Sequence, residues 1–343
     1  MVEWIPFFIG WPLLSFLVSL LLPEHEEKIH ARWARWAVGT QAAALVVFCI
    51  LWLMGEEPYL NLLEWTLYQN ADYAFYVDFY FDRVTAVFAL LGAGLALLVV
   101  SFSRIYMHRE PGYKRFFSTV LFFFLAYNTT IFAGNLETLF VGWEGLGISS
   151  FLLIAFYRER FLPVKNAIKV FSIYRIGDVG LLLAMWMSHH FWHANVHFSM
   201  LEAHDLVREH MAGHQTMAWV IAAAVLLTAM AKSAQLPFTT WLPRAMEGPT
   251  PSSAIFYGSL SVHMGAFILL RTHAFWMELP LMPWIVGGVG LSTALIATGI
   301  ARVQSSVKAQ IAYASAAQIG LIFVEIALGW NTVALVHISG NAL

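Results

Sequence analysis

Cysteine is almost absent from the sequence. Cys49 is the single cysteine among 343 residues, and it lies inside a long apolar run. A disulfide needs two thiols, and an iron–sulfur cluster or a thiolate zinc site needs several. These centres are therefore excluded for this chain on its own.

Charge is also scarce. Asp, Glu, Lys and Arg make up 12% of the residues, whereas a soluble domain usually carries about 25%. Hydrophobic residues make up 59%, and the mean hydropathy is +0.68. The net charge of -2 excludes the strongly basic field that nucleic-acid binding requires. So much apolar surface would aggregate in water, and the composition therefore predicts an integral membrane protein.

Two nucleotide-binding motifs are missing. The sequence has no G-x-x-x-x-G-K-[ST] phosphate loop, which argues against ATP-driven pumping. No G-x-G-x-x-G follows a predicted strand, which argues against a dinucleotide fold. We therefore expect no cofactor on this chain and no redox or hydrolytic centre of its own.

Long hydrophobic runs are abundant. A membrane-spanning helix needs about 20 apolar residues, and the chain offers about 10–11 such segments. They lie near residues 4–22, 36–54, 84–105, 116–134, 136–157, 166–188, 217–235, 251–272, 280–302, 310–328 and from 330 onward. The predicted fold class is an all-α, polytopic membrane bundle.

Basic residues are distributed unevenly between alternate loops. With the N-terminus outside, thirteen Lys and Arg residues fall in cytoplasmic loops, and only Arg83, Arg208 and Arg271 fall in outer loops. Cytoplasmic loops are normally enriched in Lys and Arg. We therefore predict an outside N-terminus and expect Arg271 and Glu325, which lie near span ends, to be interfacial.

The two long outer loops have distinct compositions. Residues 55–83 alternate aromatic and polar side chains, with Phe79 and Phe81 on one parity and Asp78 on the other, which predicts a small β-hairpin on the membrane surface. Residues 189–214 carry seven histidines, including His193 and His197 at a spacing of four. That spacing leaves a metal site open, but a polar loop explains the histidines equally well, and we predict no metal.

Glu144 lies near the middle of the fifth predicted span, among Gly142, Gly145 and Gly147. A charge at mid-bilayer costs at least about 2.5–3.5 kcal/mol, so it needs a partner, water or a task. The glycines leave room for a neighbouring helix. Glu144 is therefore a candidate functional residue, the alternative being a hydrogen-bonded glutamate in a packing helix.

Lys232 follows a long apolar run and precedes Pro237 and Pro243. Prolines interrupt a helix, and broken helices at membrane depth are tolerated only where they line protein or water. A Lys–Glu pair that can be made and broken would load and release protons. The alternative is a lysine at a helix end that snorkels to the interface.

Further ionisable residues lie in or near the spans. Arg175 and Asp178 are three residues apart on the sixth span, so they form either a local ion pair or a tuning element for Glu144. His263 and His337 are candidate proton relays because histidine titrates near neutral pH. The sequence pattern leaves open whether Lys308, between the ninth and tenth spans, is buried.

Four motifs carry a family resemblance. Residues Phe140–Gly147, Arg175–Val179, Ala231–Pro237 and Gly248–Ala254 resemble the large antiporter-like subunits. This family includes the L-type (subunit 5) chain of respiratory complex I, the A-type chain of multisubunit cation/proton antiporters, and the membrane subunit of two-component inorganic-carbon uptake. The match runs in order from about residue 75 to the C-terminus.

The resemblance implies a role for several of these residues. Glu144 and Lys232 would form the coupling pair of a proton half-channel, Lys308 would be the central relay lysine, and Arg175 and Asp178 would assist. The seventh helix would be discontinuous. Other membrane subunits would be partners, in the cytoplasmic (inner) membrane of a bacterium.

The resemblance also implies a division of the chain. We expect residues 1–110 to hold three helices with the outer hairpin loop 55–83, and residues 111–343 to form the proton-translocating bundle. Family members continue for several more spans, so we expect Leu343 to end the front part of a longer path. Two alternatives to proton translocation in such a complex remain. One is carbon uptake powered by proton influx with a zinc-binding, carbonic-anhydrase-like partner, and the other is a non-conducting scaffold.

Overall fold

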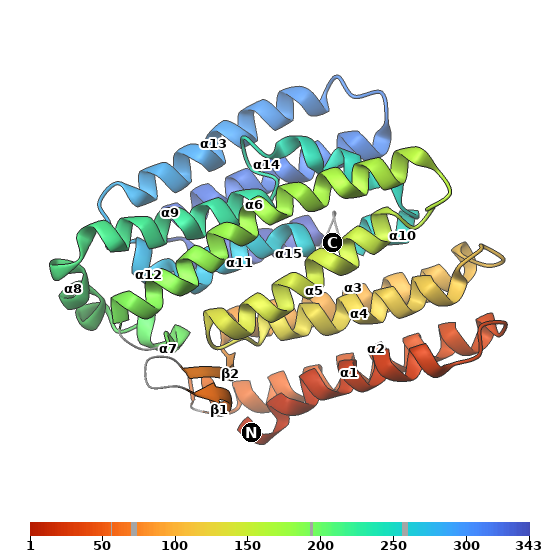
Figure 1. The fold of residues 1–343 in the computed structure, drawn as a ribbon, viewed down its shortest axis with the longest axis horizontal. Helices are drawn as coiled ribbons and strands as arrows, with labels where there is room; N and C mark the ends of the chain where they lie inside the picture. Colours follow the sequence, from red (N-terminus) through yellow and green to blue (C-terminus); the bar gives the residue numbers. More distant parts are fainter. Residues whose placement is uncertain (56, 70–73, 193–194, 256–259) are drawn as a thin grey trace.

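The computed structural model is a bundle of long helices lying roughly alongside one another, with a small hairpin at one end (Figure 1). It describes residues 1–55, 57–69, 74–192, 195–255 and 260–343. The long helices are α1 (Ile5–Leu21), α2 (Glu27–Leu53), α3 (Arg83–Tyr106), α4 (Tyr113–Ile131), α5 (Leu136–Ile154), α6 (Phe161–Trp192), α9 (Gln215–Lys232), α13 (Met282–Ala301) and α14 (Val307–Ala327).

The remaining elements are shorter. They are the strands β1 (Leu60–Gln69) and β2 (Ala74–Phe81) and the helices α7 (Phe198–Leu201), α8 (His204–Gly213), α10 (Thr250–Ser253), α11 (Met264–Arg271), α12 (His273–Trp276) and α15 (Asn331–Ala342). Within the described ranges, eight helices are long and apolar enough to cross a membrane. The predicted all-α, multi-pass membrane fold is confirmed.

The predicted seventh helix is discontinuous, as the resemblance implied. α9 ends at Lys232, and Ala234 adopts a left-handed backbone with φ of 51°. Pro237 and Pro243 follow, and short 3₁₀ turns replace the helix at residues 239–241 and 243–247. Proline lacks the N–H that helix propagation needs, so the chain cannot resume an α-helix immediately.

Other elements satisfy the backbone at this break. Ser233 donates to the Val262 carbonyl at 2.6 Å, and the Trp241 indole donates to the Ala231 carbonyl at 2.9 Å. The Leu236 amide donates to the hydroxyl of Thr293 at 3.0 Å. Irregular backbone at membrane depth is stable only where protein or water satisfies its polar groups.

The predicted eighth span at 251–272 is not a regular α-helix in its described part, and residues 256–259 lie outside the described residues. The described residues include α10, a 3₁₀ turn at 261–263, and α11. In α10 the hydroxyls of Ser252 and Ser253 both donate to the Pro249 carbonyl. Serine hydroxyls that bond to the backbone compete with helix propagation.

The predicted hairpin is present, with β1 and β2 paired antiparallel. Its buried parity is Tyr76, Asp78 and Tyr80, whereas Val77 and Phe79 are half-buried. The hairpin therefore directs a carboxylate towards the bundle. The N-terminus lies beside the hairpin (Figure 1), and we call this end of the bundle the hairpin end.

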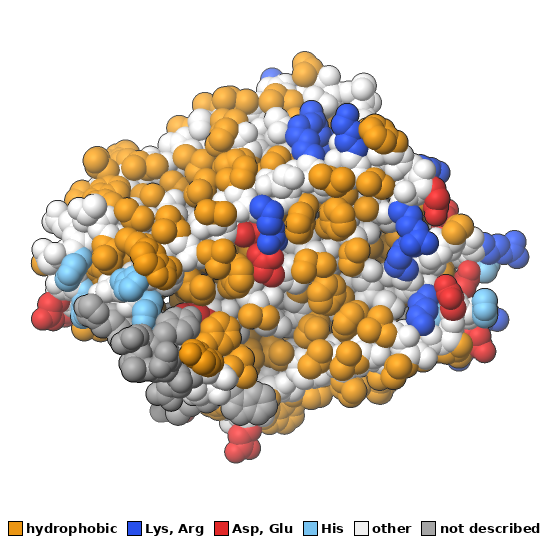
Figure 2. All heavy atoms as spheres, in the orientation of Figure 1, with side chains coloured by type: hydrophobic (Ala, Val, Ile, Leu, Met, Phe, Trp, Pro, Cys, Tyr) orange, Lys and Arg blue, Asp and Glu red, His pale blue; other side chains and the backbone are white. Residues whose placement is uncertain are grey.

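The surface differs between the two ends and the flanks. Figure 2 shows broad hydrophobic flanks, with Lys and Arg side chains gathered towards the end opposite the hairpin. We call that end the basic end. An apolar belt between two polar ends is the arrangement that a bilayer requires.

Glycines set the spacing between the central helices. A Cβ at Gly145 of α5 would come 2.8 Å from the Ala126 Cβ of α4, and one at Gly177 of α6 would come 2.8 Å from the Ala231 Cβ of α9. Small residues allow such close backbone approach. α6 is thereby held directly against the last turn of α9, which fixes the geometry of the site.

Candidate functional site

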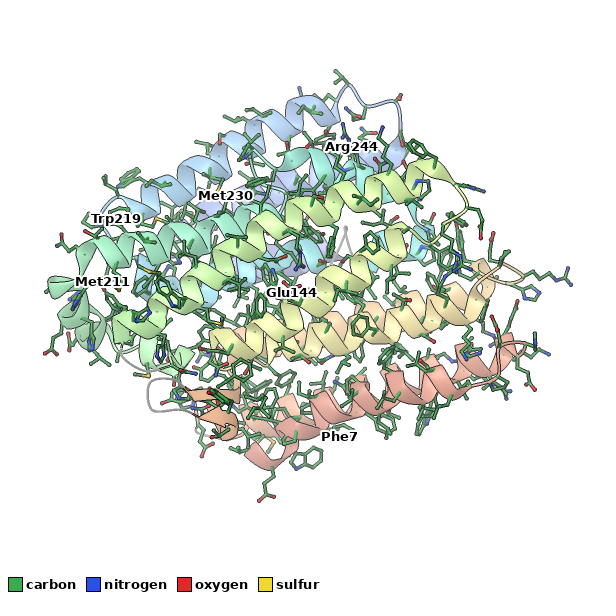
Figure 3. The ribbon with its side chains drawn as sticks, in the orientation of Figure 1. Phe7, Glu144, Met211, Trp219, Met230 and Arg244 are labelled. Atoms are coloured by element: carbon green, nitrogen blue, oxygen red, sulfur yellow. The ribbon has the colours of Figure 1, made fainter. Side chains whose placement is uncertain are left out.

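Three helices bring four charged side chains together halfway along the bundle. Glu144 comes from α5, Arg175 and Asp178 from α6, and Lys232 from the end of α9. Figure 3 labels Glu144 near the middle of the bundle's length. We call these four residues the central cluster.

Arg175 links the two carboxylates of the central cluster. Its Nη2 lies 2.6 Å from Oε2 of Glu144 and 2.9 Å from Oδ2 of Asp178. The side chain of Asp178 is 5% exposed and that of Glu144 is 20% exposed. The spacing of three on α6 places Arg175 and Asp178 on one helix face. One geometry therefore contains both the local ion pair and a contact with Glu144, whereas a role in tuning Glu144 stays a prediction.

Lys232 has a different environment. It is 2% exposed, and its Nζ has no hydrogen-bond acceptor among the described residues. The ammonium lies over the rings of Trp143 at 4.8 Å and Tyr174 at 4.5 Å. Snorkelling to the interface is therefore wrong for Lys232, because aromatic rings enclose it in the protein interior.

The direct partner of Glu144 in this structure is Arg175. Lys232 experiences the charges of Asp178 and Glu144 without an ion pair to either in the described part of the chain. Trp143 lies between, since its indole Nε1 donates to Oδ1 of Asp178 at 2.9 Å while its ring faces Lys232. A direct pairing of Glu144 with Lys232 stays a prediction.

Lys308 lies apart from the central cluster. It is half-buried in the first turn of α14, and its Nζ donates to the Met246 carbonyl at 3.5 Å. Gln235, three residues after Lys232, donates to the carbonyl of Ala316, which lies on α14 together with Lys308. Eight residues of helix separate Ala316 from Lys308, or roughly 12 Å. A central relay role for Lys308 therefore requires intermediate groups or water.

The two candidate histidines each contact polar residues of α14 or α15. His263 is buried and lies 2.9 Å from Nδ2 of Asn341. One turn earlier on α15, the Nδ1 of His337 lies 2.8 Å from Oε1 of Glu325, and its Nε2 lies 2.9 Å from Gln318. The Gln318 amide can present oxygen or nitrogen, so it suits both charge states of the imidazole. The expectation that Glu325 is interfacial is refined, because Glu325 is a half-buried partner of His337.

Arg271 is buried, and its predicted interfacial depth stays a prediction. Its guanidinium pairs with Asp82 at 2.8 Å and donates to the hydroxyl of Thr85. The rings of Tyr80 and Phe267 lie within 5.1 Å of it. Position near a span end did not predict exposure, because the hairpin covers that end of the helix.

Sequence reasoning missed two aromatic residues of the site. Trp143 and Tyr174 each immediately precede a charged residue that was singled out, Glu144 and Arg175. A buried tryptophan needs an acceptor for its N–H. The need of the indole N–H for an acceptor could have predicted a carboxylate beside Trp143.

The histidine-rich loop gives no assignment of a metal. Within the described ranges, no three His, Cys, Asp or Glu side chains are placed to hold one ion. His193 lies outside the described residues, whereas His197 pairs with Asp78 at 2.7 Å. The predictions of no metal and no cofactor remain predictions.

Comparisons with known proteins place most of the chain in one family. Residues 133–340 match the family described as NADH:quinone oxidoreductase/Mrp antiporter, transmembrane region. The chain belongs to this family. Residues 65–117 match a second family, the N-terminus of NADH-ubiquinone oxidoreductase (complex I) chain 5. The family resemblance carried by the four motifs is thus confirmed.

Curated relatives in this family are quinone oxidoreductase subunits. The chain is 32% identical to NADH-quinone oxidoreductase subunit L of Escherichia coli strain K12, over 96% of this chain and 54% of that protein. It is 30% identical to the chloroplastic NAD(P)H-quinone oxidoreductase subunit 5 of Piper cenocladum, over 99% of this chain and 46% of that protein. The chain thus spans about half the length of the curated relatives it matches.

Two solved structures share the fold. One is the Mrp complex of Dietzia sp. DQ12-45-1b, with a TM-score of 0.80 and 22% identity over 97% of this chain and 36% of that chain. The other is the membrane-bound sulfane sulfur reductase, an archaeal respiratory membrane complex, with a TM-score of 0.80 and 17% identity over 98% and 68%. At these identities the likeness establishes the fold of the family.

Proposed function

We propose that this chain moves protons across the membrane as a subunit of a multisubunit complex of the quinone oxidoreductase or cation/proton antiporter type. The observation that carries the proposal is Lys232. It is a lysine enclosed by aromatic rings, without a hydrogen-bond acceptor among the residues that the structure describes, beside two carboxylates that a single arginine holds. Intramembrane ionisable residues of this kind mark ion pathways.

The geometry supports a switch in the partner of Arg175. While Arg175 holds Glu144 and Asp178, their charges are partly neutralised and Lys232 lacks a dedicated counter-ion. If Glu144 turns away from Arg175, an unpaired carboxylate then stabilises the charged form of Lys232. Repeating this change would load and release a proton. The row of His263, Asn341 and His337 would continue the path along α14 and α15.

The test is proton flux in vesicles containing the full complex. We expect Glu144→Gln and Lys232→Ala each to abolish flux, and Lys165→Ala, an exposed lysine on α6, to leave it unchanged. Wild-type flux in both cluster variants would refute proton translocation through this cluster. Thermal unfolding of each variant checks that the loss is not a folding defect.

Membrane partners are supported by the relatives, which are named as subunits of oxidoreductases and of an Mrp complex. The names favour a respiratory or antiporter complex over carbon uptake with a zinc-binding partner. Co-purification tests this directly, with further membrane subunits expected. A single large zinc protein would instead favour carbon uptake.

A scaffold role makes an opposite prediction. Replacing both charges by uncharged side chains of similar volume, Glu144→Gln with Lys232→Met, removes the charge pair and keeps the packing. Proton translocation requires that this double variant is inactive. Full activity would establish a non-conducting scaffold.

The proposed location is a bacterial cytoplasmic membrane with the hairpin end outside. The excess of Lys and Arg at the basic end supports this orientation. Because Cys49 is buried, a membrane-impermeant maleimide should label only introduced cysteines. We expect Glu57→Cys to be labelled from outside in intact cells, and Glu159→Cys only after permeabilisation. The reverse pattern would invert the topology.

A further inference from the structure

A second group of buried titratable side chains lies at the hairpin end, separate from the central cluster. Asp78 of β2 is 1% exposed and Glu137 of α5 is 3% exposed. The side chain of His197, just before α7, is 18% exposed. We call these three residues the hairpin-end cluster.

Backbone pairing brings these residues together. Phe79 of β2 pairs with Ala133, and Asn135 pairs with His197, so the hairpin is extended by two short segments. The Gly134 amide donates to the Asp78 carbonyl at 2.8 Å. A side chain at Gly134 would collide with the Asp78 carboxylate. The cluster is thus built by the fold and does not result from flexible loop side chains.

The imidazole of His197 has hydrogen-bond partners both when it is neutral and when it is protonated. His197 Nδ1 donates to Oδ2 of Asp78 at 2.7 Å, and His197 Nε2 lies 3.0 Å from the Tyr76 hydroxyl. That hydroxyl also donates to the Asn195 carbonyl at 3.3 Å. A hydroxyl both donates and accepts. Tyr76 can therefore accept from a protonated Nε2 or donate to a neutral one.

Glu137 is the least satisfied member of the cluster. Its Oε2 is buried and has no hydrogen-bond partner within the described part of the chain. The titratable groups that act on it are His189 of α6, His197 and Asp78. Burying an unpaired carboxylate is costly, whereas the N-terminus of α5 stabilises negative charge on its first turn. Burial disfavours the ionised carboxylate and the helix N-terminus favours it. Because these two effects oppose each other, Glu137 is suited to exchanging its proton.

The hairpin-end cluster is aligned with the central cluster. Glu137 and Glu144 are seven residues apart on α5, which places them on one helix face about 10.5 Å apart along the axis. Asp178 and His189 are eleven residues apart on α6, again on one face and about 16.5 Å apart. Since α5 and α6 pack against each other, the two clusters lie at different depths of one helix interface.

We propose that Glu137 and the Asp78–His197 pair form a proton-binding site, through which water at the hairpin end exchanges protons with the central cluster. The ligand is a proton delivered by water to the partly exposed His197 imidazole and passed to the Glu137 carboxyl. The step from Glu137 to Glu144 covers about 10.5 Å along the α5–α6 interface, so water or intermediate side chains would carry the proton. This transport role rests on the proposed function, whereas proton binding at Glu137 does not.

Infrared difference spectroscopy of the full complex, titrated with pH, tests proton binding. A protonated carboxyl gives a C=O stretching band that a carboxylate and an amide lack. With the titration kept well above about pH 4.3, where an ordinary glutamate protonates, we expect Glu137→Gln to lose one such band. Glu159→Gln, an exposed control with a side chain 82% exposed, should lose none. His197→Asn should shift the pH at which the band appears. A full set of bands in Glu137→Gln would overturn the site.

Proton flux tests the exchange. Glu137→Gln is isosteric, so we expect wild-type thermal unfolding with flux reduced at least tenfold, and recovery in Glu137→Asp. Wild-type flux in folded Glu137→Gln would overturn the exchange with the central cluster. The two hypotheses fail separately. If Glu144→Gln also keeps wild-type flux, the proposed function fails, while the infrared band still decides whether Glu137 binds a proton.

Discussion

Two buried cations at different depths of the bundle, Arg271 and Lys232, have different partners. Lys232 and Arg271 are each the last residue of a helix, and each lies against aromatic rings. Arg271 has Asp82 at 2.8 Å and a hydroxyl acceptor, whereas Lys232 has neither kind of partner within the described ranges. An arginine keeps its charge under all conditions, whereas a lysine can lose it. The paired arginine is suited to holding structure, and the unpaired lysine is suited to exchanging a proton.

Removal of Arg271 should give the largest change in stability. Arg271→Met leaves the half-buried Asp82 without its partner, and breaking a buried pair costs about 3–5 kcal/mol. Thermal unfolding in detergent measures the loss. The double variant with Asp82→Asn should recover most of it, because asparagine can still cap α3, as Asp82 does through the Thr85 amide. A double variant as unstable as the single one would contradict the structural role.

Lys232 should show the opposite pattern. Lys232→Met removes the exchanging group, and we expect flux to fall about 100-fold or more, the scale of a lost acid–base group. Stability should change much less than in Arg271→Met, since no ion pair is broken. Lys232→Arg should be equally inactive, because the guanidinium does not release its proton. Retained flux in Lys232→Arg would show that only the charge matters.

Trp143 tests whether the ring and the indole N–H act separately. Trp143→Phe keeps a ring facing Lys232 but removes the donor to Asp178. An acceptor left unsatisfied in the interior costs about 1–3 kcal/mol, so the unfolding temperature should fall modestly. Flux should fall less than in Lys232→Met. Unchanged stability would show that water replaces the indole.

An exposed ion pair provides the smallest expected effect. The hydrogen bond that Arg208 donates to its carboxylate holds the pKa of Glu278 below its usual value, which is about 4.3. A lowered carboxyl pKa stabilises the fold above that usual value and stops doing so as pH falls through the lowered one. Arg208→Gln should therefore differ slightly from wild type at neutral pH and not at all in strong acid. Thermal unfolding of both proteins at a series of acidic pH values measures this. A stability difference that grows as the pH falls would contradict a lowered pKa for Glu278.

The sequence predicted the depth of the charges better than their partners. Long apolar runs identified most of the helices, and the scarcity of charge identified Glu144 and Lys232. The partner of Glu144 depends on the rotation of α5 against α6, which periodicity does not determine. Thr85, which accepts from Arg271, lies 186 positions away along the chain. Contacts between residues so far apart in the sequence depend on how the hairpin packs against the bundle.

The hairpin-end cluster was missed for a related reason. Glu137 occupies the first turn of a helix, where an acidic residue is usual. Only the burial caused by β2 and residues 133–135 makes it unusual. The break in the eighth span was missed because hydropathy measures apolar content and does not detect serine hydroxyls that bond to the backbone.

The close packing of α6 on α9 has a consequence for the assembled complex. A Cβ at Gly180 would come 2.7 Å from the Ala224 carbonyl oxygen, and one at Gly177 would come 2.8 Å from the Ala231 Cβ, so a side chain at either position would push the two helices apart. With α6 and α9 in such close contact, we expect any change of partner among Arg175, Glu144 and Lys232 to come from side-chain torsions. Under the proposed function, such a cycle would leave the outline of the bundle unchanged, and neighbouring subunits would stay in place.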